Sequence, residues 1–200
     1  MYIPPANRMS DTSAAHAAMR AHDFAALVTW APDGLVATHV PLLLDIGEGP
    51  LGTLYGHIAR ANPHCAALDG EHMAIFSGPH AYISPTWYPD PKLRVPTWNY
   101  VAVHAYGRGE TLKGADAENV IARMVAHYEP SHDWTLETVS GDYKAKLLAA
   151  ITAFKIVLTR IDAKTKLDQN KPAADRLAVA TALEARGETQ LARLMREVGV

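Results

Sequence analysis

The sequence predicts a mainly β protein with added helices (α+β), built around a small antiparallel barrel. Three observations favour this fold class. About six short apolar segments are rich in β-branched residues and are separated by turn residues. The early segments leave no stretch between them for a full crossover helix, which parallel strands would require. The longer helical patterns come late in the chain, so we expect those helices as additions to the strands.

Length and composition suit one domain with a helical appendage. The chain has 200 residues, of which 48% are hydrophobic and 20% charged, enough for a sizeable core. A formal net charge of −2 gives no global attraction to nucleic acid or an anionic membrane. No apolar run approaches the roughly 20 residues of a membrane span, and the start MYIPPANRMSD lacks a signal-peptide pattern. We expect a cytoplasmic protein with no membrane partner, a main domain over residues 1–170 and a helical extension over 171–200.

The first part of the chain is predicted to fold into short strands joined by turns. Ser10 or Asp11 can cap a short helix that ends near residue 20. In the turn 31–34 (APDG), proline presets φ and glycine accepts positive φ, so the flanking strands should form a hairpin. Pro41 lies inside an apolar run and indicates a bulge or an edge position. Strands are expected at residues 24–30, 35–44, 53–58 and 73–77.

A long aromatic segment follows, from Gly78 to Tyr106. It alternates Trp, Tyr, His and Asn with β-branched residues, and prolines at 85, 89, 91 and 96 interrupt it. We therefore expect two strand pieces joined by a shaped loop, the second continuing over residues 100–111. The segment either lines a site for a planar ligand or forms a bulged sheet edge whose Trp and Tyr keep one end in water.

The last part of the chain is predicted to be helical, with one more strand at residues 154–161. Apolar residues recur at helical spacing in the stretch 115–128, which indicates an amphipathic helix on the strands. Further helices are expected at residues 142–149, 172–185 and beyond Gly187. The final pair superficially resembles a helix-turn-helix, whose arginines 176, 186, 193 and 196 would meet phosphates. Three glutamates dilute that charge, so a packing or dimer element is the favoured interpretation.

A candidate phosphate site follows the third predicted strand. The stretch 56–63 (GHIARANP) places an imidazole, a guanidinium and an amide just before a helix that should start at Asn62-Pro63 and end near residue 70. Free N–H groups and the helix dipole attract anions there, and Arg60 supplies a planar fork that matches phosphate oxygens. The alternative is that Asn62 only caps the helix while Arg60 and His57 are solvated. Neither the Rossmann nor the P-loop glycine pattern occurs.

Other chemistry has less support in the sequence. The stretch 164–172 clusters three lysines with two amides, and either reaches a ligand or forms a solvated turn with Asn170 as a helix N-cap. Ten histidines invite a metal or haem, but they show no HExxH or local ligand pair, so no metal site is expected. Cys65, the single cysteine, excludes an internal disulfide and should be a small buried or half-buried side chain. No nucleophile elbow surrounds any serine, and the catalytic residues, if any, stay unknown.

Six sequence blocks together closely resemble the PaiB-type family of FMN-binding negative transcriptional regulators. They occur in the family's order over nearly the whole chain: residues 1–5 (MYIPP), 39–45 (HVPLLLD), 56–63 (GHIARANP), 78–88 (GPHAYISPTWY), 95–107 (VPTWNYVAVHAYG) and 166–176 (KLDQNKPAADR). The resemblance implies a split β-barrel like that of pyridoxamine-phosphate oxidases. It also implies FMN as the cofactor and a homodimer with flavin near the subunit interface.

The resemblance further implies where the flavin binds. The block 56–63 would contact the phosphate, in agreement with the charge argument, and the block 39–45 would run beside the isoalloxazine. The expected cofactor-binding residues are Thr38, His39, Val40, Pro41, Leu42, His57, Ile58, Ala59, Arg60, Asn62, Trp98, Lys166, Gln169 and Asn170. Two positions depart from the family's last block, because Thr165 and Asp168 stand where Trp and Ser are usual. The first removes a stacking surface and the second adds a negative charge.

Several functions are compatible with these patterns. The first is an FMN-binding regulator in which flavin is a sensed or redox ligand. The second is a flavin-dependent oxidoreductase whose pocket, lined by Trp87, Trp98 and Tyr100, admits a small planar substrate. A sequence-specific DNA binder and a haem-binding protein are further alternatives. A homodimer, a small-molecule ligand and DNA are thus the partners that the sequence leaves open.

Overall fold

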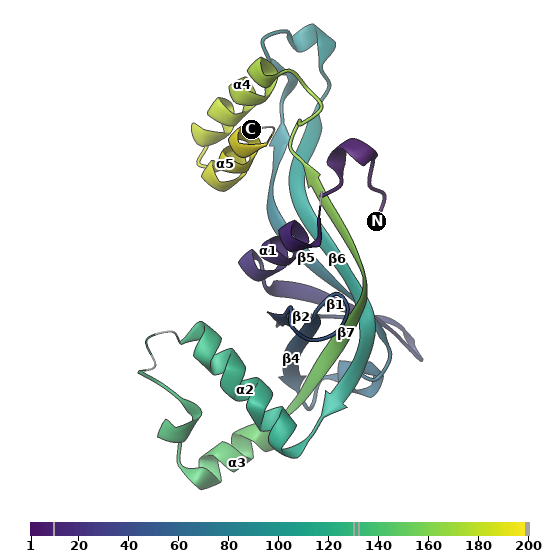
Figure 1. Cartoon of the computed structure of the whole chain (residues 1–200), viewed down its shortest axis with the longest axis vertical. Coiled ribbons are helices and arrows are strands. Elements are labelled where there is room, and N and C mark those ends of the chain that lie inside the picture. Colours follow the sequence, from purple (N-terminus) through teal and green to yellow (C-terminus); the bar gives the residue numbers. More distant parts are fainter. Residues whose placement is uncertain (10, 130, 132, 199–200) are drawn as a thin grey trace. The chain divides into compact units, whose positions relative to one another are not determined.

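The fold is an antiparallel sheet with added helices, as predicted. The computed structural model describes residues 1–9, 11–129, 131 and 133–198 (Figure 1). Within these ranges, seven strands form one sheet in the order β2-β1-β5-β6-β7-β4-β3. The strands are β1 (Phe24–Ala31), β2 (Gly34–Pro41), β3 (Leu43–Asp45), β4 (Thr53–Ala59), β5 (Glu71–Ile83), β6 (Thr97–Leu112) and β7 (Ile151–Lys166). Because β2 and β3 end this order, the described sheet is not closed.

Five α-helices lie in the described part of the chain. They are α1 (Thr12–Ala21), α2 (Gly114–Tyr128), α3 (Gly141–Ala149), α4 (Ala173–Glu184) and α5 (Thr189–Glu197). Short 3₁₀ turns occur at Pro5–Asn7, Pro63–Ala67, Pro85–Trp87, Pro91–Leu93 and Leu136–Thr138. None of the helices in the described ranges is both long enough and apolar enough to span a membrane.

The local turn and cap predictions are confirmed. Gly34 has a φ of 116°, and β1 pairs with β2 so that Trp30 lies opposite Leu35. Asp11 caps α1, because its Oδ1 accepts from the backbone N–H of Ala14 at 2.8 Å. Ser10, the other predicted cap, lies outside the described residues.

Two predicted elements differ from the structure near the start of the sheet. The expected strand 35–44 breaks after Pro41, and the N–H of Leu42 donates to Asp23 O at 2.9 Å. The next piece, β3, pairs with β4 instead of β1, since a proline cannot donate to the ladder at this point. The expected helix 62–70 is a 3₁₀ turn over Pro63–Ala67, although Asn62 caps it as predicted.

Three strands are longer than predicted. β5 continues through Pro79, β6 begins at Thr97, and β7 extends to Lys166, so residues 164–166 are strand rather than loop. The expectation that Asn170 caps the next helix is wrong, because the N-cap position of α4 is Pro172. Cys65 is half-buried, as expected.

The chain divides into two compact units, each assembled from separate segments. The first unit comprises residues 1–18, 77–103 and 162–200, and the second comprises 19–76 and 104–161. β5, β6 and β7 contribute residues to both units. The final helices, which the sequence placed in an extension over 171–200, therefore share a unit with the N-terminus and the aromatic loop.

In the first unit, α4 and α5 form a tightly linked helical pair (Figure 1). Their apolar residues pack against the ends of β5 and β6 in a core that includes Ile83, Leu183 and Met195. Arg176 is buried and donates from Nε to Met195 O at 2.9 Å. Arg196 donates to both carboxylate oxygens of Glu184 at 3.0 and 2.7 Å. Side-chain bonds thus reinforce the apolar contact between these helices.

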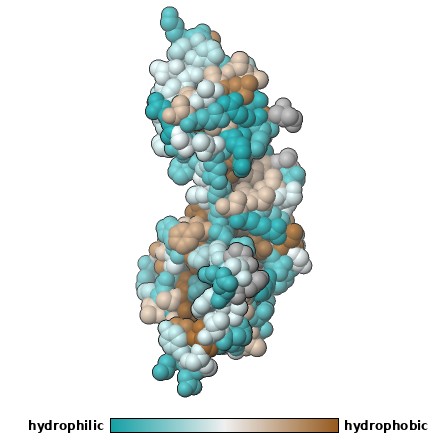
Figure 2. Space-filling view, turned by 90° about the vertical axis from the view of Figure 1, so that its left-hand side faces the viewer, coloured by the Kyte–Doolittle hydropathy of each residue, from teal (hydrophilic) through white to brown (hydrophobic). Residues whose placement is uncertain are grey.

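In the second unit, α2 covers β4 and β7. Val120 and Met124 of this helix are buried against Tyr55 and Ala153. The amphipathic helix predicted at 115–128 therefore packs on the strands, as expected. On the face drawn in Figure 2, hydrophobic colour appears in separate patches between hydrophilic ones.

Candidate functional site

A chain of hydrogen bonds joins buried side chains inside the second unit. Thr29, His64 and His72 are each at most 3% exposed. His72 Nε2 lies 2.8 Å from Leu68 O, which can only accept, so this nitrogen carries a proton. The Thr29 hydroxyl then donates to His72 Nδ1 and accepts from His64 Nε2 at 2.8 Å. The pattern assigns both imidazoles the neutral Nε2–H tautomer.

Burial supports this neutral assignment. Loss of solvent lowers the pKa of both imidazoles below the ordinary value, and His72 lowers that of His64 further. Gly109 allows the β6 backbone to approach the His72 ring, and its N–H donates to Gly70 O at 2.9 Å. A Cβ at Gly109 would lie 2.0 Å from Leu68 O and 2.4 Å from His72 Nε2. Only glycine fits at this position without a shift of the backbone.

The same hydrogen-bond chain orients two predicted flavin contacts. The Thr38 hydroxyl lies 2.9 Å from His64 Nδ1, which is the acceptor in this tautomer, so the hydroxyl donates its only proton there. Asn62 Nδ2 donates to Thr38 Oγ1 at 3.2 Å, while Asn62 Oδ1 accepts from His64 N at 2.9 Å. Thr38 can therefore offer a ligand only a lone pair, and Asn62 one remaining N–H.

Arg60 lies in a groove of about 320 Å³ beside the N-terminus of α2. Its Nε donates to Ala149 O at 2.6 Å and its Nη2 to Ile151 O at 2.7 Å. These two bonds fix the plane of the exposed guanidinium. Nη1 makes no hydrogen bond within the described ranges, so this side of the fork can meet an anion.

The groove around Arg60 has further groups that suit an anion. Lys113 lines it together with two threonines, Thr111 and Thr152. Glu118 is also part of the lining, but its carboxylate is paired with Lys144. The first N–H groups of a 15-residue helix begin beside these side chains. The donors therefore outnumber the free carboxylates in this groove.

His57 is not joined to Arg60 or Asn62 by any hydrogen bond between described residues. Its Nδ1 lies 3.4 Å from Met124 Sδ under α2, and burial lowers its pKa. The other expected contacts in the second unit differ in exposure. Ile58, Val40 and Leu42 are buried, Pro41 is half-buried, and Ala59 and His39 are exposed, the latter stacked on Phe24.

The remaining expected cofactor residues belong to the first unit. Lys166 donates from Nζ to Trp98 O at 2.8 Å, and burial lowers its pKa. The Gln169 side chain is engaged with the backbone, accepting from Leu167 N at 2.7 Å and donating to Thr165 O at 2.6 Å. Lys166 and the exposed Asn170 line a groove of about 300 Å³. Trp98 lies in a different groove, which is lined by aromatic side chains.

Asp168, one of the two departures from the family pattern, is buried and satisfied. Its Oδ2 accepts from Tyr88 OH at 2.6 Å, and its Oδ1 lies 3.1 Å from Lys171 Nζ. Burial and this carboxylate raise the pKa of Tyr88. Asp168 has a φ of 61°, a conformation that Asp tolerates better than most residues. The added charge therefore has a structural partner in Lys171.

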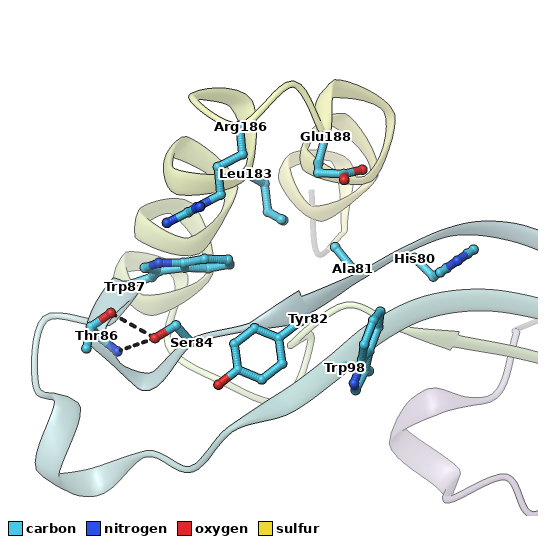
Figure 3. Close-up of a pocket in the computed structure, with 10 residues that line it drawn as sticks. All are labelled: His80, Ala81, Tyr82, Ser84, Thr86, Trp87, Trp98, Leu183, Arg186 and Glu188. Atoms are coloured by element: carbon cyan, nitrogen blue, oxygen red, sulfur yellow. Dashed lines mark hydrogen bonds between the residues drawn. The ribbon is translucent and has the colours of Figure 1, made fainter.

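An aromatic groove of about 680 Å³ lies within the first unit (Figure 3). Tyr82 stands between Trp87 and Trp98, edge-on to both, with ring centroids 6.5 and 6.2 Å away. Arg186 covers the Trp87 ring at 4.8 Å from its centroid. The segment 78–106 thus forms two strand pieces joined by a shaped loop, as predicted, and Tyr82, Trp87 and Trp98 line a hollow.

Sequence reasoning missed three residues of the buried chain, Thr29, His64 and His72. The histidines were weighed only as metal ligands, and in the described ranges no group of three such ligands converges. His64 had a usable signal, because it directly follows the Asn62-Pro63 cap. The pairing of Thr29 with His64 in a 3₁₀ turn and with His72 on β5 had none.

Comparison with known proteins agrees with this fold. A sequence model of the family described as "Putative FMN-binding domain" matches residues 1–160. The protein "Protease synthase and sporulation protein PAI 2" of Bacillus subtilis is 31% identical over 206 residues, covering 98% of this chain and 97% of that protein. An uncharacterised protein of Aspergillus fumigatus is 30% identical, covering 76% of this chain and 77% of its own.

Solved structures share the architecture at low sequence identity. The flavocytochrome Anf3 of Azotobacter vinelandii has a TM-score of 0.60 at 15% identity, covering 79% of this chain and 68% of that chain. The FAD- and haem-binding protein of Mycobacterium smegmatis has a TM-score of 0.59 at 12% identity, covering 80% and 73%. The predicted split-barrel, pyridoxamine-phosphate-oxidase-like fold is confirmed, and FMN is the cofactor that the family model names. The chain belongs to this family of FMN-binding domains, as its resemblance to the PaiB-type proteins predicted.

Proposed function

We propose that the protein binds FMN with its phosphate on Arg60, and that flavin acts as the sensed or redox ligand of a regulatory protein. The observation that carries the proposal is the fixed guanidinium of Arg60. Two of its N–H groups are held by Ala149 O and Ile151 O, and Nη1 is left for an anion. A guanidinium that is already held in one orientation loses less conformational entropy when it binds phosphate.

The donor set of the Arg60 groove fits a phosphate group. Arg60 and Lys113 supply two positive charges, and the start of α2 supplies backbone N–H groups and the positive end of a helix dipole. Thr38 would accept from the flavin and Asn62 would donate to it, in the directions that His64 fixes. Bound FMN would supply one- and two-electron redox chemistry.

A titration with FMN tests the phosphate assignment. Flavin fluorescence or absorbance would give the Kd of the native protein and of Arg60→Gln. Because a charge-assisted hydrogen bond contributes roughly 1.5–3 kcal/mol, the variant should bind FMN about 10- to 150-fold more weakly. Arg108→Gln is the matched control. Arg108 is 71% exposed, and its ion pair with Glu71 is long, with 4.0 Å between Nη1 and Oε1. Equal affinities of the native protein and Arg60→Gln would refute the assignment.

In the proposed regulatory role, flavin is the signal. The final helices α4 and α5 have few unpaired arginines with which to contact DNA phosphates. Arg176 is buried and donates to Met195 O, Arg193 pairs with Glu197 of its own helix, and Arg196 pairs with Glu184 of α4. We expect weak, salt-sensitive DNA binding by this pair. Fluorescence anisotropy with a duplex at increasing salt, with and without FMN, measures it. Tight binding that survives physiological salt would show that the final helices read DNA after all.

A flavin-dependent oxidoreductase is the second candidate function, and the aromatic groove of the first unit favours it. Tyr82 is 44% and Trp98 54% exposed there, as expected for walls that receive a planar substrate. Anaerobic reduction of bound FMN by NADH, followed by turnover with an added acceptor, would support this function. Reduction without turnover would favour the sensing role.

A further inference from the structure

We propose that the aromatic groove of the first unit binds a free aromatic amino acid. The ring would lie against Tyr82 and Trp98, the carboxylate at Arg186 and the ammonium at Glu188. This inference does not depend on flavin binding, because every residue that carries it belongs to the first unit and to none of the contacts proposed for the phosphate.

The first argument is the aromatic wall. β5 supplies Tyr82, the following turn supplies Trp87, and the start of β6 supplies Trp98. Tyr82 and Trp98 meet at 75° and leave about half of their surface exposed, so two ring surfaces face the hollow (Figure 3). Exposed rings gathered at a concave site are typical of ligand-binding grooves. An aromatic ring bound there would gain edge-to-face or stacked contacts.

The second argument is a pair of opposite charges on the facing wall. Arg186 and Glu188 flank Gly187, which has a φ of 84°. The N–H of Glu188 donates to Leu183 O and that of Gly187 to Glu184 O, an arrangement typical of a helix C-cap. Neither charged side chain forms an ion pair within the described part of the chain. The cap thus places one cation and one anion, neither of them in an ion pair within the described residues, beside the hollow.

The charge balance selects the class of ligand. The lining carries one guanidinium and one carboxylate as permanent charges. A dianionic phosphate would place two negative charges against a single cation with Glu188 nearby, which is unfavourable. A zwitterion matches both groups, because a planar guanidinium recognises a carboxylate and a carboxylate recognises an ammonium. An aromatic ring combined with a zwitterion defines an aromatic amino acid.

The third argument is that the groove is already rigid. Arg196 ties α5 to Glu184 of α4, and the buried Arg176 joins the same helices through Met195 O. On the opposite wall, Ser84 caps the turn that carries Trp87, accepting from the N–H of Thr86. A ligand would therefore bind to walls that need little further ordering.

Equilibrium dialysis with labelled L-tryptophan tests the proposal, with three competitors that each lack one feature. Indole-3-propionate lacks the ammonium, tryptamine lacks the carboxylate and L-leucine lacks the ring. We expect saturable binding of L-tryptophan at ~1 mM or tighter. Each competitor should bind about tenfold more weakly than L-tryptophan, because each loses one charge-assisted contact or the ring contact. Equal affinity of all four compounds would overturn the proposal.

Two variants assign the charges. Arg186→Gln should weaken the binding of L-tryptophan about tenfold. The affinity for tryptamine should be unchanged, because tryptamine has no carboxylate that could contact Arg186. Glu188→Gln should weaken the binding of L-tryptophan but leave the affinity for indole-3-propionate unchanged, because that compound lacks the ammonium group. Arg193→Gln is the control, since Arg193 lies on α5 outside the groove and is 69% exposed. These side chains are exposed, so the variants should fold.

Other outcomes count against the proposal. If Arg193→Gln changed the affinity as much as Arg186→Gln, the effect would be one of general charge. If a second copy of the chain covers the rings instead, L-tryptophan will not bind and Trp98→Ala will lower the mass measured by light scattering. Either result would overturn the assignment of an amino acid to this groove, and neither would affect the FMN proposal.

Discussion

The buried hydroxyl of Thr29 offers a direct test of the hydrogen-bond chain in the second unit. Thr29→Val keeps the shape of the side chain but removes the oxygen that joins His72 Nδ1 to His64 Nε2. Both imidazoles would then each leave one buried polar atom without a partner. At about 1–3 kcal/mol for each unsatisfied group, the free energy of unfolding should fall by roughly 2–6 kcal/mol.

Thr29→Ser is the matched control for this loss. It keeps the oxygen and deletes only a buried methyl group, at a cost of about 1 kcal/mol. Urea unfolding at pH 7.5, with the slope against urea compared between variants, would give both values. Flavin affinity should also drop in Thr29→Val, because His64 would lose the partner that sets the direction of the Thr38 hydroxyl. If Thr29→Val is as stable as Thr29→Ser, the proposed chain of donors and acceptors is wrong.

Three further predictions follow from the structure. Burial lowers the pKa of His57, His64 and His72 below their unfolded value, so unfolding takes up protons. Their contribution to stability should be complete above about pH 6.5 and fall below it, by up to about 1.4 kcal/mol per pH unit for each proton, as thermal unfolding against pH would show. Gly109→Ala should destabilise the protein by roughly 1–3 kcal/mol in the same assay, because its Cβ would collide with Leu68 O; an unchanged midpoint would contradict this. The homodimer stays a prediction, and Trp30, 75% exposed on the β1–β2 hairpin, is a candidate contact. Trp30→Ser should shift light scattering toward the monomer mass, and an unchanged mass would exclude this surface.

The sequence allowed the local features of the fold to be predicted well. The glycine turn at 34, the cap at Asn62 and the amphipathic helix over residues 115–128 depend on neighbouring residues, and all three are present. Strand lengths were predicted less well. The fourth strand was expected only over residues 73–77, whereas β5 runs over Glu71–Ile83, and the lysines at 164–166 suggested a loop where β7 continues. Pairing with neighbouring strands determines where such strands end, and the polarity of the residues alone does not.

The candidate site could be predicted only in part, for a similar reason. The short block at 56–63 pointed to Arg60, but the carbonyl groups that orient it come from Ala149 and Ile151, far along the chain. Residue spacing cannot show that Thr29, from another strand, would join two histidines. The sequence showed that Asp168 adds a negative charge to the last block, but not that Tyr88 and Lys171 would be the partners of its carboxylate.

The most direct test of FMN binding through Arg60 compares the affinities of the protein for FMN and for riboflavin, which lacks the phosphate. The proposal predicts that the native protein binds FMN at least about tenfold more tightly than riboflavin. It also predicts that Arg60→Gln removes most of this preference and leaves riboflavin affinity nearly unchanged. Equal affinity of the native protein for the two flavins, or a preference that survives in Arg60→Gln, would contradict the central claim.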